Sequence, residues 1–166
     1  VEKELSSMGT VESFQCDLSD LASVKKFADE VKSKHASIDI LINNAGIFKT
    51  PSPITESGHD IRFVVNTIAP YLLTQELLPI IPTKGRVINV ASAGQAPVSI
   101  KAMLGQERLE DFEAYAQSKL AIIMWSRLMA EKLRDKGVVM ISVNPASLLG
   151  SKMVKEGFGV EGKDLG

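Results

Sequence analysis

Strand-like and helix-like patterns alternate along the whole chain, and this alternation constrains the fold more than any other feature of the sequence. Apolar runs with the length of buried strands lie at residues 11–17, 38–42, 85–92 and 138–143. Each is separated from the next by a longer segment with helical periodicity. Such an order predicts βαβ units and a parallel sheet, so the expected fold class is α/β.

The helical segments carry their own start signals. Ser19 and Asp20 can cap a helix that begins at Leu21. A second helix is expected from about residue 59 to residue 78, with Asn66 in its middle and a kink at Pro70. The third should run from about residue 112 to residue 133. The three helices would connect the four strands.

Tyr115 and Lys119 stand four residues apart near the start of the third helix. This spacing places the phenol and the ammonium on one helix face, one turn apart. An ammonium about 4 Å away stabilises phenolate by about 4 kcal/mol at an effective dielectric constant near 20. The pair could therefore perform acid–base chemistry near neutral pH. Alternatively, the spacing arises by chance and both residues are amphipathic helix surface.

Polar residues follow three of the expected strands. The motif Asn43-Asn44-Ala45-Gly46 follows residues 38–42, Ser92 ends residues 85–92, and Asp17 ends residues 11–17. The carboxyl ends of parallel strands share one edge, where ligands bind. The small residues Ala45 and Gly46 would let a flat ligand approach the backbone. Asp17 could accept a hydrogen bond from an exocyclic amine or could cap a helix, and the sequence favours neither.

Composition excludes several classes of protein. A net charge of −1 and the lack of a dense basic run provide no field for binding nucleic acid. No apolar stretch is long enough to span a bilayer, and no signal-peptide pattern opens the chain, so a cytoplasmic location is expected. Cys16 is the only cysteine, and His35 and His59 lack ligand spacing, so no metal site is expected.

These motifs resemble the short-chain dehydrogenase/reductase family, and the resemblance covers nearly the whole chain. The matches are Asn43-Asn44-Ala45-Gly46, Asn66, Ser92, and Tyr115 with Lys119, in this order. The resemblance implies that residues 1–166 form a single partial dinucleotide-binding domain with a Rossmann-like, doubly wound parallel sheet. It also implies NAD or NADP as cofactor and hydride exchange between an alcohol and a carbonyl.

The resemblance also implies a role for each matching residue. Ser92 would polarise the substrate carbonyl and Tyr115 would donate the proton. Lys119 would assist Tyr115 and bridge to the nicotinamide ribose, and Asn66 would complete the proton relay through a water molecule. Asn66 is otherwise an amide in a helix interior, a position that does not favour asparagine.

Cofactor contacts can be carried over wherever the residues match. Asp17 corresponds to the position beside the adenine, and Asn44, Ala45 and Gly46 correspond to the segment beside the adenosine ribose. Tyr115 and Lys119 would contact the nicotinamide end. Pro145 and Leu148 lie in the segment that lines the nicotinamide. Here Ala146 replaces the glycine that commonly follows Pro145, and its methyl group could narrow the pocket.

The chain departs from the family at its ends. It shows no Gly-x-x-x-Gly-x-Gly turn for a pyrophosphate, and it starts with Val and stops before the last expected helix and strand. We therefore expect a domain truncated at both ends, and NAD cannot be distinguished from NADP. The alternative function is a non-catalytic module that keeps the fold for binding or interaction.

The long separation between Ser92 and Tyr115 resembles the retinol-dehydrogenase-like branch. Such an insertion could set specificity or act as a lid over the substrate pocket. Ser99, within it, is a rival to Ser92 as the catalytic serine. Trp125 is expected to pack between helices or subunits, and the family implies a homodimer or homotetramer. The expected substrate is a small or lipophilic alcohol or carbonyl compound.

Overall fold

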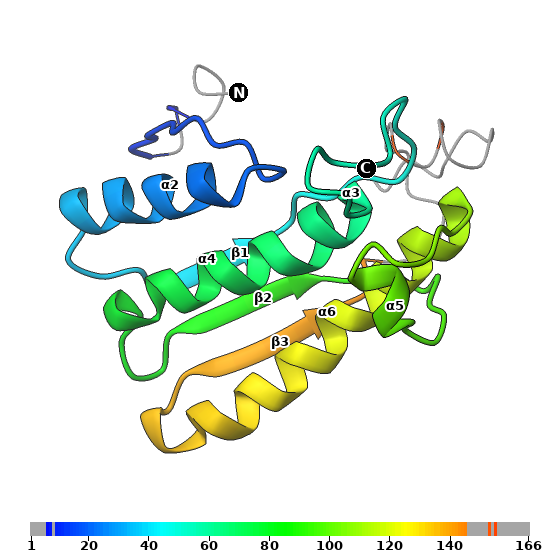
Figure 1. Ribbon diagram of the computed structural model, residues 1–166. Coiled ribbons are helices and arrows are strands. Elements are labelled where there is room, and N and C mark those ends of the chain that lie inside the picture. Colours follow the sequence, from blue (N-terminus) through cyan, green and yellow to red (C-terminus); the bar gives the residue numbers. More distant parts are fainter. Residues whose placement is uncertain (1–5, 8, 146–152, 154, 156–166) are drawn as a thin grey trace.

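Three parallel strands form the sheet in the computed structural model shown in Figure 1, which describes residues 6–7, 9–145, 153 and 155. They are β1 (Ile40–Asn43), β2 (Arg86–Val90) and β3 (Val139–Val143), in the spatial order β1-β2-β3. Arg86 is the register partner of both Ile40 and Val139. The α/β class and the parallel sheet predicted from the sequence are confirmed.

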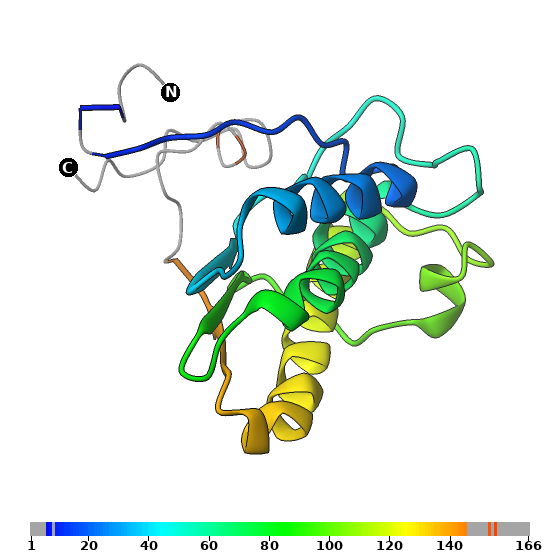
Figure 2. The same ribbon diagram turned by 90° about the vertical axis from the view of Figure 1, so that its left-hand side faces the viewer.

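Three longer helices cover the same face of the sheet, as Figure 2 shows. They are α2 (Leu21–Lys34), α4 (Ala69–Leu77) and α6 (Asp111–Leu133). Asp20 caps α2 by accepting a hydrogen bond from the Ala22 amide, as predicted. The shorter helical pieces are α3 (Ile61–Phe63), η1 (Val64–Ile68), η2 (Leu78–Ile80), α5 (Ile100–Met103) and η3 (Arg134–Lys136).

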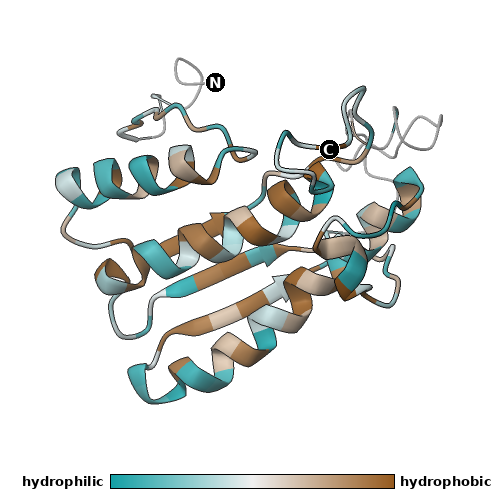
Figure 3. Ribbon diagram, in the orientation of Figure 1, coloured by the Kyte–Doolittle hydropathy of each residue, from teal (hydrophilic) through white to brown (hydrophobic). Residues whose placement is uncertain are grey.

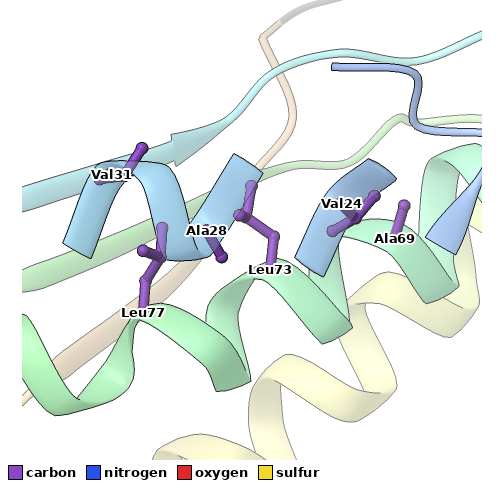
Figure 4. Packing of buried hydrophobic residues seen from close by; sticks show 6 residues of the cluster. All are labelled: Val24, Ala28, Val31, Ala69, Leu73 and Leu77. Atoms are coloured by element: carbon purple, nitrogen blue, oxygen red, sulfur yellow. The ribbon is translucent and has the colours of Figure 1, made fainter. Parts of the chain in front are cut away.

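Two apolar clusters hold the helices together and onto the sheet. In the first, Val24, Ala28 and Val31 of α2 meet Ala69, Leu73 and Leu77 of α4 (Figure 4). In the second, Val87 of β2 and Val138 before β3 pack on Met129 and Leu133 of α6. Figure 3 shows hydrophobic residues along the strands, α4 and α6, whereas α2 is largely hydrophilic outside its packed stripe.

The opposite face of the sheet carries exposed apolar side chains. Ile40 and Ile42 of β1 and Val139 and Ile141 of β3 alternate with residues that face the helices, because successive side chains on a strand point to opposite faces. Ile42 is 57% exposed. Parallel strands normally read as apolar on both faces because both are covered, and the sequence of these strands follows that rule.

The prediction of a strand at residues 11–17 is wrong. This segment is extended, but it pairs with no strand of the described chain. Instead it lies beside α2, where the Phe14 ring packs edge-on against Phe27 at 5.8 Å and the Asp17 amide donates to Ser23 Oγ at 3.0 Å. A strand requires a neighbouring backbone for its hydrogen bonds, and local sequence pattern does not supply one.

The second predicted helix is present but is interrupted before Pro70. Residues Val64–Ile68 form a π-helical turn between α3 and α4, in which the Ala69 amide donates to the Val64 carbonyl. Pro70 has no N–H group, so it cannot donate to the carbonyl of Asn66, its partner in a regular α-helix. The irregularity therefore centres on Asn66. Such π-helical turns occur frequently at functional sites.

Among the described helices, none combines the length and the apolar character that crossing a membrane requires.

We predict that Leu77→Ala lowers the free energy of unfolding of the full-length chain by about 2–5 kcal/mol, because it opens a cavity between α2 and α4. Urea denaturation followed by circular dichroism measures this loss. Leu128→Ala is the matched control, since Leu128 is 60% exposed on α6 and should change stability by less than about 0.5 kcal/mol. Equal losses for both variants would contradict the assigned core.

Candidate active site

The Asn66 carboxamide is the centre of the candidate active site. Its Oδ1 accepts from the Ile47 amide at 2.8 Å, and its Nδ2 donates to the Ile47 carbonyl at 2.9 Å. Nδ2 also donates to Ser118 Oγ of α6 at 3.0 Å. Asn66 is 1% exposed, so these bonds satisfy polar atoms that would be costly to bury unpaired. The Asn66 side chain thus connects the loop after β1 with η1, to which Asn66 belongs, and with α6.

Lys119 of α6 buries its ammonium against the end of β2. Nζ donates to the Val90 carbonyl at 2.8 Å, and the residue is 3% exposed. Removal from water disfavours the charged form, so burial lowers the pKa of Lys119 to about 8. The Lys119 side chain therefore loses its positive charge as the pH rises through about 8.

Gly46 lies directly beside these two residues. A Cβ atom built at Gly46 would come within 3.2 Å of Lys119 Nζ and 3.3 Å of Asn66 Oδ1. Both distances are tighter than ordinary van der Waals contact, so only glycine fits here without displacing a neighbour. The structure thus brings Gly46, Asn66 and Lys119 together from three separate parts of the sequence.

Tyr115 precedes Lys119 by one turn of α6, as predicted. Lys119 Nζ lies 5.9 Å from the centre of the Tyr115 ring, and the ring packs edge-on against Phe48 at 4.9 Å. Tyr115 is largely buried. Within the described residues, its hydroxyl forms no hydrogen bond to protein, so it can bond to a substrate oxygen. The ammonium is fixed by Val90 rather than by the phenol.

Ser92 follows β2 and is half-buried at the same edge of the sheet. Its Oγ accepts from the Gly94 amide at 3.1 Å, which leaves its proton able to point to another oxygen. A Cβ at Gly94 would lie 3.7 Å from this Oγ and 3.6 Å from the Phe112 ring, one turn before Tyr115. In the part of the chain that the structure describes, Ser92 and Tyr115 share no hydrogen bond.

The rival serine, Ser99, has a structural task. Its Oγ accepts from the Ala102 amide at 3.2 Å as the N-cap of α5 and donates to Glu107 at 2.6 Å. Its own amide donates to Gln117 of α6 at 2.8 Å. These bonds fix the insertion between Ser92 and Tyr115 against α6. Ser92 is therefore the better candidate for a catalytic serine.

Four of the residues expected to contact the cofactor are exposed. Asn44, Ala45 and Pro145 are exposed after β1 and β3. Asp17 is exposed before α2, and the Ser19 hydroxyl, with a smaller effect of the Ser19 amide, lowers the pKa of its carboxyl group. Asp17 is not the N-cap, because Asp20 caps α2. Leu148 and Ala146 lie outside the described residues.

An apolar cavity of about 410 Å³ opens beside β1. Its lining residues include Phe14, Cys16, Ile40, Ile42, Asn44 and Ala45. Cys16 is half-buried in this wall. The exposed amide of Asn44 and the close approach at Gly46 are compatible with a flat nucleotide at this edge.

A hydrogen-bonded network of buried polar side chains, which the sequence did not predict, connects β1 and β2 with α4 and α6. Asn43 Nδ2 donates to Thr74 Oγ1 of α4 at 3.1 Å and to Asn89 Oδ1 of β2 at 2.7 Å. Asn89 Nδ2 then donates to Ser126 Oγ of α6 at 2.8 Å. This network holds β1 and β2 in register with two helices. Asparagines at two register-paired positions, Asn43 and Asn89, were the available signal.

The two histidines lie apart and have other partners. His35 lies 3.1 Å from Glu12, and His59 Nδ1 lies 3.1 Å from Ser57 Oγ. Across the described residues, no group of three His, Cys, Asp or Glu side chains could hold a metal ion.

The chain is similar in sequence to retinol dehydrogenases. It is 33% identical over 134 residues to human retinol dehydrogenase 13, which covers 78% of this chain and 40% of that protein. It is 34% identical over 137 residues to mouse retinol dehydrogenase 12, with 80% and 43% covered. The chain thus spans less than half the length of these relatives. They confirm the predicted resemblance to the retinol-dehydrogenase-like branch.

Solved structures show the same fold. A metagenomic short-chain oxidoreductase in complex with NADP matches with a TM-score of 0.69 and 32% identity, over 89% of this chain and 64% of that one. This likeness confirms the Rossmann-like fold class. The sequence profile of the short chain dehydrogenase family matches residues 1–159. This chain therefore belongs to the short-chain dehydrogenase family.

Proposed function

We propose that this chain belongs to an NAD(P)-dependent oxidoreductase that interconverts an alcohol and a carbonyl compound. The observation that carries the proposal is the buried Lys119 ammonium beside Asn66 and one turn from Tyr115. Burying an ammonium is costly, and chains retain such groups mainly where chemistry uses them. The family to which the chain belongs supports the same reaction class.

Tyr115 is the proton donor in the proposed reduction. Its ring packs edge-on against Phe48, so the hydroxyl extends from an aromatic wall. The Lys119 ammonium stabilises the phenolate that forms when the proton leaves, since an opposite charge favours the ionised form. Ser92 donates a hydrogen bond to the substrate oxygen. Asn66 would complete the relay through a water molecule that returns a proton to the site. Ser92, Tyr115, Lys119 and Asn66 together form the proposed proton relay.

NAD or NADP would be held by the exposed edge that follows the strands. Asn44, Ala45, Gly46 and Asp17 would contact the adenosine half, and Pro145, Leu148 and Lys119 the nicotinamide half. When bound, the dinucleotide supplies or accepts the hydride. The metagenomic relative of known structure was solved with NADP, which supports this class of cofactor.

Other expectations stay predictions. They are a single partial domain over residues 1–166, a cytoplasmic location and a homodimer or homotetramer. A small or lipophilic alcohol or carbonyl substrate is compatible with the aromatic wall around Tyr115.

Replacing the proposed proton donor should abolish most activity. We predict that Tyr115→Phe lowers kcat of the full-length enzyme by about 10²–10⁴-fold, because the general acid is lost while the ring is kept. Steady-state oxidation of the reduced dinucleotide with an aldehyde substrate measures kcat. Tyr71→Phe is the matched control, since Tyr71 is the other tyrosine and is 41% exposed. Unchanged turnover in Tyr115→Phe would refute the proton-donor role, and dinucleotide binding without turnover in the unaltered protein would favour a non-catalytic module.

The activity should fall as pH rises through about 8. Burial lowers the pKa of Lys119 to about 8, so its ammonium is present below this pH and is lost above it. The pH dependence of kcat/KM for carbonyl reduction measures this alkaline limb. In Lys119→Arg the positive charge persists, so the limb at about pH 8 should disappear even if the rate is lower. A limb that stays at about pH 8 in Lys119→Arg would assign it to another group.

A further inference from the structure

A buried arginine joins the two helices that carry the candidate active site. Arg62 of α3 is 1% exposed, and its Nε and Nη2 donate to the two carboxylate oxygens of Asp60 at 2.8 and 2.7 Å. Its Nη1 donates to Asp111 in the first turn of α6. We call Asp60, Arg62 and Asp111 the arginine clamp. A guanidinium satisfied on several N–H groups by two carboxylates forms a rigid, planar connection.

The clamp lies one helical turn before the relay on both helices. Arg62 precedes Asn66 by four residues, and Asp111 precedes Tyr115 by four and Lys119 by eight. On α6, residues at this spacing share a helix face. The clamp and the relay are therefore successive layers of the same contact between α3–η1 and α6.

A second layer of polar contacts lies just beyond the clamp. Asn66 Nδ2 donates to Ser118 Oγ at 3.0 Å, and Thr67 Oγ1 donates to the Ser118 carbonyl at 2.8 Å. Both contacts come from the π-helical turn η1. A π-helical turn is irregular, so the direction of the Asn66 side chain depends on how both ends of the turn are held. The clamp holds its N-terminal end, and the α2–α4 cluster holds its C-terminal end.

We propose that the arginine clamp is a positioning device for the proton relay: it fixes the axial register of α3–η1 against α6 and thereby keeps both Asn66 and Lys119 close to Gly46. This inference rests on the proposed function of the relay. Asp60, Arg62 and Asp111 act through Asn66 and Lys119 and touch no reacting atom. A displacement of about 1 Å at such a site can cost about 100-fold in rate.

Asp111 is the member of the clamp that can be changed most safely. Its side chain is 48% exposed, and without it Arg62 keeps both hydrogen bonds to Asp60, so no buried charge is left unpaired. Asp111→Ala therefore removes only the hydrogen bond between the clamp and α6, and leaves the bonds of Asn66 and Thr67 to Ser118 in place. Asp111→Asn keeps an oxygen that can accept from Nη1 and is the conservative variant. Glu131→Ala is the control, because Glu131 forms an exposed pair with Arg127 at 3.9 Å on the same helix.

The protonation of Lys119 reports on the contact directly and without any turnover. Among the described residues, the Lys119 ammonium contacts the Val90 carbonyl and lies near Gly46 and the Tyr115 ring, and Tyr115 is the titratable residue of these three. Burial lowers the pKa of the Lys119 ammonium to about 8. If the helices separate, water reaches the ammonium and the pKa rises toward its ordinary value of 10.5.

The test is an NMR titration of Lys119 in the full-length chain labelled with ¹³C-lysine, together with kcat and KM. Asp111→Ala should raise the Lys119 pKa and lower kcat by about 10–100-fold, with a smaller change in KM. Asp111→Asn should restore most of both quantities, and Glu131→Ala should match the unaltered protein. A folded Asp111→Ala variant with unchanged Lys119 pKa and unchanged kcat would overturn the proposal. If Asp111→Ala does not fold, Asp111→Lys, which cannot accept from Arg62, is compared with Asp111→Asn. A higher Lys119 pKa and a lower kcat in Asp111→Lys than in Asp111→Asn support the clamp, and equal values in the two variants overturn it.

Failure of the clamp and failure of the proposed function give different results. If the relay has another function, Tyr115→Phe leaves turnover intact, while the Lys119 titration still shows whether the clamp holds the helices. If only the clamp is wrong, Tyr115→Phe is inactive and Asp111→Ala is normal in both measurements.

Discussion

The site depends on one carboxamide, that of Asn66. It bonds to both backbone groups of Ile47 and to Ser118 of α6, so it fixes the loop after β1 between two helices. An asparagine inside a helix lowers helix stability, because its side chain competes for backbone hydrogen bonds. Here Pro70 leaves a π-helical turn around Asn66, and the Asn66 side chain forms its hydrogen bonds outside its own helix. The loop after β1, α6 and Lys119 are therefore arranged around Asn66.

The interior of this α/β layer is unusually polar near its carboxyl edge. Asn43, Asn89 and Ser126 are buried in a continuous hydrogen-bonded network, and Lys119 is buried against the Val90 carbonyl. Such networks specify one arrangement of elements, because any shift leaves a buried polar group without a partner. The apolar clusters provide stabilisation, and the amides determine register. Apolar packing therefore stabilises the layer, while hydrogen bonds fix the place of the Lys119 ammonium.

The sequence predicts the parts of this structure that depend on local pattern. The three paired strands, the Asp20 cap and the long helix with Tyr115 and Lys119 follow from periodicity and capping rules. Contacts between distant residues do not. The strand expected at residues 11–17 finds no neighbour, and Arg62 meets Asp111 across 49 positions. The partner of Lys119 is likewise a backbone carbonyl 29 positions away, which no side-chain motif encodes.

The central claim is that the relay makes this an oxidoreductase, and the most direct measurement is the coupled oxidation of NADH or NADPH by the full-length protein with a series of aldehydes. We expect the reduced nicotinamide absorbance to fall in step with formation of the alcohol, with one molecule consumed for each alcohol made. A folded protein that binds the dinucleotide but oxidises it with no carbonyl compound in the series would contradict the account.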